Sequence, residues 1–71
     1  MKQQEPQQRL GRRVRQLRLE RGLSQEALGE LAGLDRTYIS STESGRRNVT
    51  IQTINKLAKA LGVAPADLLN D

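Results

Sequence analysis

Helical stretches that each end on a single glycine are the feature that most constrains the fold of this sequence. In the first stretch, Leu10, Val14 and Leu17 repeat at the i, i+4, i+7 spacing of a helix that buries one side. Glycine ends helices because it adopts the left-handed backbone conformation without steric cost. Such helix ends are expected at Gly22, Gly33, Gly45 and Gly62. Since no stretch of useful length alternates in polarity like a strand, we predict an all-α, compact five-helix domain.

The residues that precede these stretches predict where the helices begin. Ser24, Asp35 and Thr50 are good N-caps, because a short polar side chain accepts a hydrogen bond from a free backbone N–H of the first turn. Pro65 fits the first turn of a short fifth helix. Its cap, Ala64, offers no side-chain acceptor, so we expect this end of the domain to fray.

The apolar faces of the second and fourth helices complete the expected core. In the second helix, Leu28, Leu31 and Ala32 are expected to point inward. Gly11 and Gly29 lie inside helices, where glycine costs about 1 kcal/mol relative to alanine. Gly29 is therefore expected to allow the close approach of another helix. The expected apolar face of the fourth helix is Ile51, Ile54, Leu57, Ala58 and Leu61.

Composition narrows the classes of function. The 71 residues suit one small domain, with residues 1–8 (MKQQEPQQ) predicted as a flexible N-terminal tail and residues 9–71 as the folded domain. With no Cys and no His, the sequence lacks the ligands of zinc fingers and the groups for disulfides and for thiol or imidazole catalysis. No apolar run reaches membrane-spanning length, and the N-terminus lacks a signal-peptide core. We expect a cytoplasmic protein with no membrane partner, no metal and no cofactor.

The charge favours a partner rich in phosphate. The formal net charge is +4, and nine of the twelve basic residues are arginines. This sign is typical of proteins that bind nucleic acid. A merely solvated basic surface explains the charge equally well. Among the acidic residues, Glu26 and Glu30 lie one helical turn apart, a spacing that is more often solvated than catalytic, so no enzymatic activity is predicted.

The stretch DRTYISSTESGRR, residues 35–47, predicts a helix whose outward face suits the major groove of DNA. On a helical wheel, Ile39 and Thr42 mark the inward side. Small side chains on the outward side would let the backbone approach base edges, and arginine can donate two hydrogen bonds to guanine. The alternative is an exposed polar face with hydroxyl caps and no partner. The outward arc consists of Arg36, Thr37, Ser40, Ser41 and Ser44.

The neighbours of this helix favour the DNA-binding interpretation. A preceding helix and a short turn through Gly33 complete a helix-turn-helix unit. Arg46 and Arg47 follow at once and are expected to bind phosphates beside the groove. Gln25, in the first turn of the preceding helix, is expected to add a phosphate contact, helped by that helix N-terminus.

The segment GLSQEALGELAGLDRTYISSTESGRRNVTIQTINKLAKALGV, residues 22–63, resembles the phage-repressor or Cro-like (XRE-type) family of helix-turn-helix proteins. With RVRQLRLER ahead of it, the resemblance covers about residues 10–69. LSQEALGELAGL and INKLAKALGV carry it in combination. GLDRTYIS followed by an Arg–Asn pair resembles the controller proteins of restriction–modification systems. The resemblance implies a lambda-repressor-like domain that binds a pseudo-palindromic operator as a homodimer, with the third helix (about 35–44) reading the major groove.

The resemblance also implies roles for individual residues. Arg18 and Glu43 match a semi-buried ion pair that braces the first helix against the third. Two alternatives stay open: Tyr38 packs on the flank of the third helix, and Arg18 and Glu43 are unrelated surface charges. The base-reading positions match Arg36, Thr37, Ser40 and Ser41. The DNA-backbone positions match Gln25, Tyr38, Ser44, Arg46, Arg47 and Asn48.

The sequence departs from the family pattern at several positions. Thr42 stands where a large aliphatic residue is usual, so its hydroxyl must find a local carbonyl or the core is underfilled. Thr42→Ile is therefore expected to stabilise the fold. Ser41 replaces a common glycine or basic residue, so base preference cannot be carried over. The sequence stops at Asp71, soon after the fifth helix. A dimer surface is thus expected from Leu68, Leu69 and the fourth helix, although both leucines fit the core equally well.

Two classes of function follow from this resemblance. The first is a sequence-specific regulator of transcription that binds double-stranded DNA, with Glu26 and Glu30 as candidate contacts to RNA polymerase. The alternative is a DNA-binding antitoxin or a protein-interaction module whose main partner is another protein. The N-terminal tail lacks apolar anchors after Met1, which argues against a segment that wraps a toxin.

Overall fold

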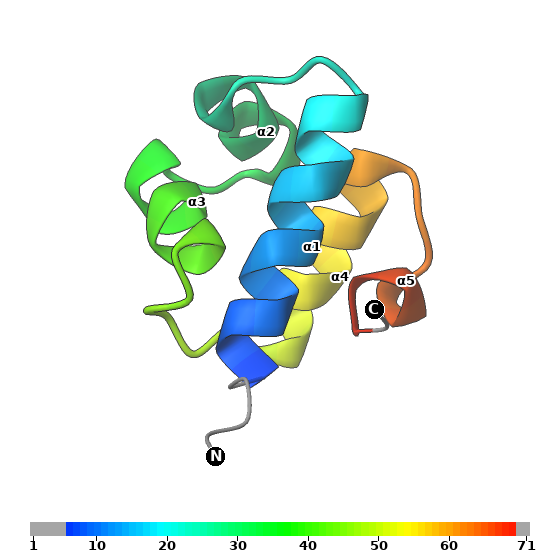
Figure 1. Cartoon of the computed structure of the whole chain (residues 1–71). Helices are drawn as coiled ribbons and strands as arrows, with labels where there is room; N and C mark the ends of the chain where they lie inside the picture. Colours follow the sequence, from blue (N-terminus) through cyan, green and yellow to red (C-terminus); the bar gives the residue numbers. More distant parts are fainter. Residues whose placement is uncertain (1–5, 70–71) are drawn as a thin grey trace.

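The computed structural model describes residues 6–69, which form five helices around one core (Figure 1). The prediction of an all-α, five-helix domain is confirmed. The helices are α1 (Pro6–Glu20), α2 (Gln25–Ala32), α3 (Arg36–Glu43), α4 (Ile51–Leu61) and α5 (Pro65–Leu69). None of the helices in this range is long and apolar enough to cross a membrane.

Caps fix the ends of the helices as the sequence predicts. Ser24 Oγ accepts a hydrogen bond from Ala27 N at 2.9 Å, and Thr50 Oγ1 accepts one from Thr53 N at 3.2 Å. The four glycines predicted to end helices all have positive φ, between 67° and 78°. The helix bounds are thus set locally, by short polar side chains at the starts and by glycines at the ends.

The start of α5 is stabilised by a residue that the sequence analysis did not single out. Ala64 N donates to Asp67 Oδ2 at 3.0 Å. This contact is one half of a capping box, in which an acidic side chain in the first turn accepts from the backbone of the capping position. It compensates for the missing side-chain acceptor at Ala64. The predicted end of the fifth helix, residues 70–71, lies outside the described range.

The core lies where the five helices meet. Helices α1 and α4 run side by side through the middle of the molecule, with α2 and α3 on one side and α5 on the other (Figure 1). The third helix packs on both α1 and α2, which fixes its direction relative to the rest of the domain. The buried apolar residues are Leu10, Val14, Leu17, Leu28, Ala32, Ile39, Leu57, Ala58, Leu61 and Leu68.

Two apolar residues lie on a different side of their helix from the one predicted. Leu31 and Ile51 were predicted inward but are 61% and 74% exposed. Each lies roughly 100° around its helix from the centre of the buried stripe, so it falls on the flank of the helix. In α4 the first turn buries Thr53 instead of Ile51. Leu68 is 1% exposed and lies in the core, which is one of the two positions that the sequence left open for it, whereas Leu69 is exposed.

The first helix begins earlier than the sequence predicts. Because α1 starts at Pro6, residues 6–8 are helical and do not belong to the tail. Proline is well tolerated in a first turn, where its missing N–H costs nothing. The side chain of Gln8 lies against Gly45, in the turn that ends α3, and this contact holds the first turn of α1. Residues 1–5 of the predicted tail lie outside the described range.

Two helix-interior glycines allow backbone to pass close to backbone. A Cβ built at Gly11 would overlap the carbonyl oxygens of Thr42 and Glu43, so α1 and the end of α3 touch directly. A Cβ built at Gly29 would lie 2.5 Å from Leu34 O. The close approach expected at Gly29 is therefore present, but its partner is the turn before α3 and not another helix. Both glycines position α3.

Candidate nucleic-acid interface

Helix α3 presents a polar face because its apolar residues are few and lie on one side. Ile39 and Thr42 are buried, 0% and 1% exposed, against the core. Arg36 and Thr37 are exposed on the other side, and Ser40 is half-buried. Asp35 caps the helix, since its Oδ2 accepts from Thr37 N at 2.8 Å. This hydrogen bond, with the nearby charge of Arg36, lowers the pKa of the Asp35 carboxyl.

Helices α2 and α3 form the predicted helix-turn-helix unit. The turn between them closes with a hydrogen bond from Leu34 N to Gly29 O at 2.7 Å. Gly33 has φ of 72°, which lets the chain leave α2 at once. Because both helices also pack on the core, α2 supports α3 from behind and leaves its polar face free.

A chain of three side chains joins α1, α2 and α3. Arg18 and Glu43, which the resemblance paired, form a two-pronged ion pair: Nε to Oε2 at 2.5 Å and Nη2 to Oε1 at 3.0 Å. Their side chains are only 10% and 5% exposed. Arg18 Nη1 also donates to Leu23 O at 2.8 Å. The hydrogen bond to Glu43 raises the pKa of Arg18, which keeps the guanidinium charged in spite of burial.

Gln25 is the third member of this chain. Its Nε2 donates to Glu43 Oε1 at 3.1 Å, so this amide is directed toward the ion pair. The sequence predicts Gln25 only as a phosphate contact. The structure holds it at the first turn of α2, half-buried, with its side chain tied to the C-terminal end of α3.

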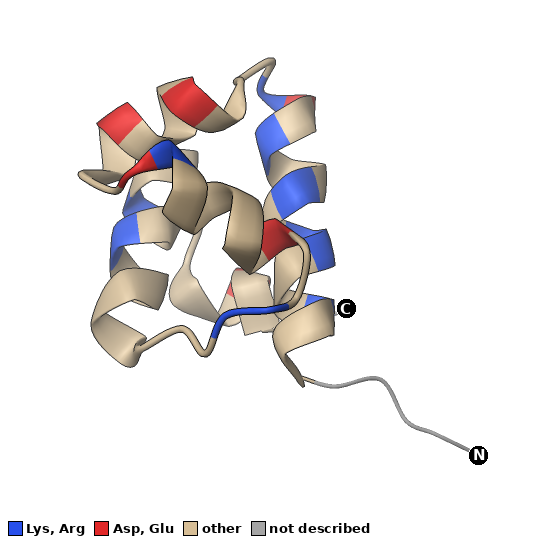
Figure 2. Ribbon diagram, turned by 90° about the vertical axis from the view of Figure 1, so that its left-hand side faces the viewer, with Lys and Arg blue, Asp and Glu red and all other residues tan. Residues whose placement is uncertain are grey.

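Basic residues lie at both ends of α3. Figure 2 shows α3 toward the viewer, with one basic segment at its start and another in the loop that follows it. Arg36 supplies the first, and Arg46 and Arg47 supply the second. Asn48 follows them and is exposed. The polar face of α3 is therefore bracketed by positive charge, an arrangement that suits a groove with a phosphate strand on each side.

The two loop arginines fold back onto α3. Arg47 Nε donates to Ser41 Oγ at 2.7 Å, and its guanidinium carbon lies 4.2 Å from the centroid of the Tyr38 ring. Arg46 Nε donates to Ser44 Oγ at 3.1 Å. The structure thus brings together residues that the sequence assigned to different roles. Two serines on one helix face, followed by two arginines, were the sequence signal for this arrangement, but the loop conformation was not predictable from it.

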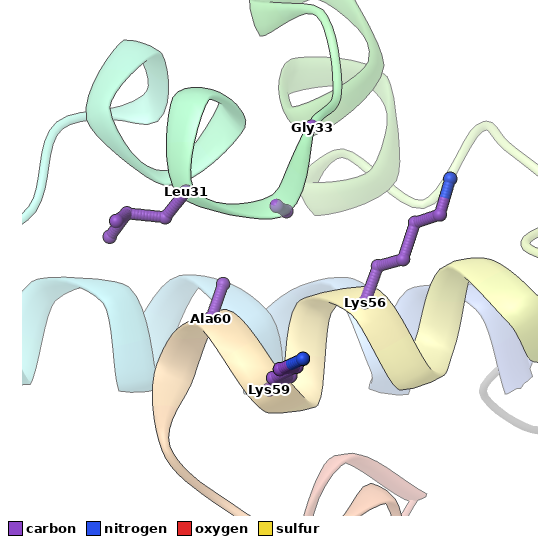
Figure 3. Close-up of a pocket in the computed structure, with 6 residues that line it drawn as sticks. Leu31, Gly33, Lys56, Lys59 and Ala60 are labelled. Atoms are coloured by element: carbon purple, nitrogen blue, oxygen red, sulfur yellow. The ribbon is translucent and has the colours of Figure 1, made fainter.

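A groove on the surface lies away from this face. A groove of about 540 Å³ runs between α2 and α4, with Leu31 on one wall and Lys56, Lys59 and Ala60 on the other (Figure 3). None of the predicted site residues lines it, and its lining carries no carboxylate, hydroxyl or thiol group. Within residues 6–69, no group of three or more His, Cys, Asp or Glu side chains is placed to hold a metal ion.

Comparison with known proteins agrees with this geometry. Residues 9–70 match the family model of a helix-turn-helix domain. Control protein C.BamHI of Bacillus amyloliquefaciens is 52% identical over 61 residues, which cover 84% of this chain and 75% of that protein. Control protein C.SmaI of Serratia marcescens is 50% identical over 60 residues, 84% of this chain and 71% of that protein.

A solved structure agrees equally well. The restriction–modification controller protein C.AhdI from Aeromonas hydrophila superposes with a TM-score of 0.86 at 48% identity, covering 87% of this chain and 94% of that chain. These relatives are regulators and not enzymes, and the same holds for this protein. Its helix-turn-helix is that of a DNA-binding transcriptional regulator. The chain belongs to the XRE-type, Cro-like family of helix-turn-helix proteins.

Proposed function

We propose that this protein controls transcription of a restriction–modification operon by binding its operator DNA as a homodimer. The observation that carries the proposal is the polar face of α3, bracketed by arginines and braced by a buried ion pair. The names of its relatives support the biological setting, since they are control or controller proteins. Because the proposed target is DNA, the proposed site of action is the cytoplasm.

The side chains of α3 and of the segments beside it divide into proposed readers of bases and proposed contacts to phosphate. Arg36, Thr37 and Ser40 are the proposed readers, because they lie on the outward face and carry donors suited to base edges. Ser41, predicted with them, already shares its hydroxyl with Arg47. The proposed contacts to the DNA backbone are Gln25, Tyr38, Ser44, Arg46, Arg47 and Asn48.

Exposed apolar residues support a homodimer through the ends of α4 and α5. Ile51 opens α4 and is 74% exposed, and Leu69 closes α5 and is 59% exposed. In Figure 1, the start of α4 and the end of α5 lie in the same lower part of the molecule. In a dimer paired through this region, the two copies of α3 would lie about 34 Å apart, which is the distance between successive major grooves on one side of the duplex.

A contact to RNA polymerase would require a surface that DNA leaves free. Glu26 and Glu30 are exposed on α2, beside the helix that faces DNA. We propose them as the acidic part of such a surface. In this arrangement an activating protein would bind the groove with α3 and present α2 to polymerase.

Selection of bound sequences from a random pool of DNA duplexes tests the proposal. At near-physiological salt, the expected result is two inverted half-sites centred about one helical turn apart. Arg36→Ala should then weaken binding to the selected site by about 10-fold or more, with less effect on random DNA. Arg12→Ala is the matched control, because it removes an exposed arginine from α1, away from α3.

Other outcomes would point elsewhere. A pool without any motif, bound only at low salt, would contradict sequence-specific regulation. If Arg36→Ala weakened binding to the selected site and to random DNA equally, Arg36 would be a contact to phosphate and not to a base. Co-purification with a protein encoded by a neighbouring gene would favour the alternative, a DNA-binding antitoxin.

A further inference from the structure

Ser41 in α3 and Ser44, which caps the C-terminal end of α3, each hold one arginine of the loop that follows. Ser41 Oγ accepts from Arg47 Nε at 2.7 Å, and Ser44 Oγ accepts from Arg46 Nε at 3.1 Å. The two serines are three residues apart, on one side of the helix, and the arginines are neighbours in the loop. The same kind of contact is therefore made twice in parallel.

The serine hydroxyls are oriented to accept. Ser41 Oγ donates its own hydrogen to Tyr38 O at 3.1 Å, and Ser44 Oγ donates to Ser41 O at 3.0 Å. A hydroxyl has one hydrogen and two lone pairs. Since the hydrogen is used within the helix, a lone pair of each oxygen is left for an arginine.

Because each serine binds the Nε–H of its arginine, the two Nη groups of that arginine remain available to donate to another partner. A guanidinium has five N–H donors, and four of them belong to the two Nη groups. Within residues 6–69, the Nη groups of Arg46 and Arg47 make no hydrogen bond to the protein. These are the groups that form two-pronged contacts with phosphate.

Arg47 is held more firmly than Arg46. Its guanidinium also lies over the Tyr38 ring, 4.2 Å from the centroid, so one face is covered by the aromatic ring. Arg47 is half-buried, whereas Arg46 is exposed. A hydrogen bond together with a stacked ring fixes both the position and the plane of the Arg47 guanidinium.

We infer that Ser41 is a positioning residue that holds Arg47 ready for a DNA phosphate, and that it does not read a base. Ser44 holds Arg46 in the same way, with less constraint. This positioning raises the affinity for DNA, because the long arginine side chain is ordered before binding and loses less conformational entropy in the complex. This inference rests on the proposed function and assigns Ser41 a role different from the base-reading one that the resemblance implied.

Ser41→Ala separates positioning from base reading. If Ser41 positions Arg47, affinity should fall about 3- to 10-fold for the selected operator and for a random duplex alike. The slope of log affinity against log salt should stay unchanged, because Arg47 still reaches a phosphate. Arg47→Ala should instead reduce that slope by about 0.9. Ser41→Thr keeps the hydroxyl and should restore most of the affinity.

Arg47→Lys provides a second, independent variant. Lysine keeps the positive charge but has no donor at the Nε position. It should therefore reproduce the loss seen with Ser41→Ala, and the double variant should bind no more weakly than either single one. Arg12→Lys is the matched control, since it makes the same exchange at an exposed arginine of α1, away from α3. It should leave binding to the random duplex unchanged.

A measurement on the free protein distinguishes a failure of the proposed DNA-binding function from a failure of the positioning role of Ser41. In the free protein, the Arg47 Nε–H should give an ordered, slowly exchanging NMR signal that Ser41→Ala removes. If no duplex binds, the proposed function fails while this signal still decides whether Ser41 holds Arg47. The positioning role is overturned if Ser41→Ala weakens only the operator complex, if Ser41→Ala and Arg47→Lys are additive, or if the NMR signal is absent.

Discussion

Thr42 is a polar residue at a core position that an apolar side chain would fit better. Its side chain is fully buried, and Oγ1 is a buried polar atom with no hydrogen-bond partner. A buried hydroxyl without a partner costs about 1–3 kcal/mol. Thr42→Val keeps the shape and removes the hydroxyl, so it should stabilise the domain by about 1 kcal/mol and raise the melting temperature by about 4–8 °C. Thermal unfolding followed by circular dichroism measures this shift.

Thr53 offers a matched control for Thr42. It is also buried, 9% exposed, but its Oγ1 accepts a hydrogen bond from Thr50 Oγ1 at 3.1 Å. Thr53→Val should therefore lower the melting temperature or leave it unchanged. A lower melting temperature for Thr42→Val would mean that the hydroxyl finds a partner in solution. Thr42→Ile, which the sequence alone favoured, adds volume as well and is the less direct test.

Gly11 shows how one residue sets the distance between two helices. Helix propensity alone predicts that Gly11→Ala stabilises by about 1 kcal/mol. The structure predicts the reverse, because a Cβ there meets the carbonyl oxygens of Thr42 and Glu43. We expect a net loss of about 1–3 kcal/mol in the free energy of unfolding, measured in urea.

The control for Gly11 lies on the same helix. Arg15→Ala changes an exposed side chain and should stay within about 0.5 kcal/mol of the unsubstituted protein. Stability equal to or above that of the unsubstituted protein for Gly11→Ala would show that α1 can move away from α3 at little cost. Helix α3 would then be less firmly positioned than its contacts indicate.

At the scale of single elements, local rules predicted the helices well. Ser24, Asp35 and Thr50 cap as expected, because capping depends on residues within one turn. The direction of each helix face was less predictable. Leu31 and Ile51 fit a helical repeat, but which arc is buried depends on the neighbouring helices. A short helix with apolar residues over a wide arc leaves that choice to the tertiary structure.

The cap of α3 predicts a pH dependence. The pKa of Asp35 is lowered, chiefly by the hydrogen bond from Thr37 N. A carboxyl whose pKa is lower in the folded state stabilises the fold above its unfolded pKa of about 3.9. That contribution is lost as the pH falls through the lower, folded value.

Asp35→Asn isolates this effect, because asparagine caps equally well but does not titrate. The melting temperature of the unsubstituted protein, minus that of Asp35→Asn, should be constant near neutral pH and decrease as the pH falls below about 4. Other groups titrate alike in both proteins and cancel. A difference that stays constant down to about pH 2 would mean that the Asp35 carboxylate adds nothing to the cap.

At the scale of the whole molecule, long-range contacts were predictable only through the resemblance. Arg18 and Glu43 are 25 residues apart, and no local pattern pairs them. The outward face of α3 was predictable from its own helical wheel. The return of Arg47 onto Ser41 was not, because it depends on the path of the loop between α3 and α4. What the sequence placed correctly is local, and what it missed is how one element meets another.

The distribution of exposed apolar residues over the molecule leads to a prediction about assembly. Four large apolar side chains are exposed in the described range: Leu19, Leu31, Ile51 and Leu69. Only Ile51 and Leu69 belong to the proposed dimer surface at the ends of α4 and α5. Ile51→Lys and Leu69→Lys should each weaken the dimer, because a charge would then face the partner copy across an apolar contact.

Sedimentation velocity over a range of protein concentrations measures this effect. Leu19→Lys and Leu31→Lys are matched controls, since they alter leucines of similar exposure, 54% and 61%, on α1 and α2. We expect the first pair of variants to shift toward monomer and the second pair to match the unsubstituted protein. Ile51→Lys and Leu69→Lys should also lose binding to an operator with two half-sites. They should keep weak binding to a single half-site, because α3 is unchanged. If only Leu31→Lys dissociates the protein, the copies meet through the groove between α2 and α4, and the spacing of the two α3 helices must be derived from that surface instead.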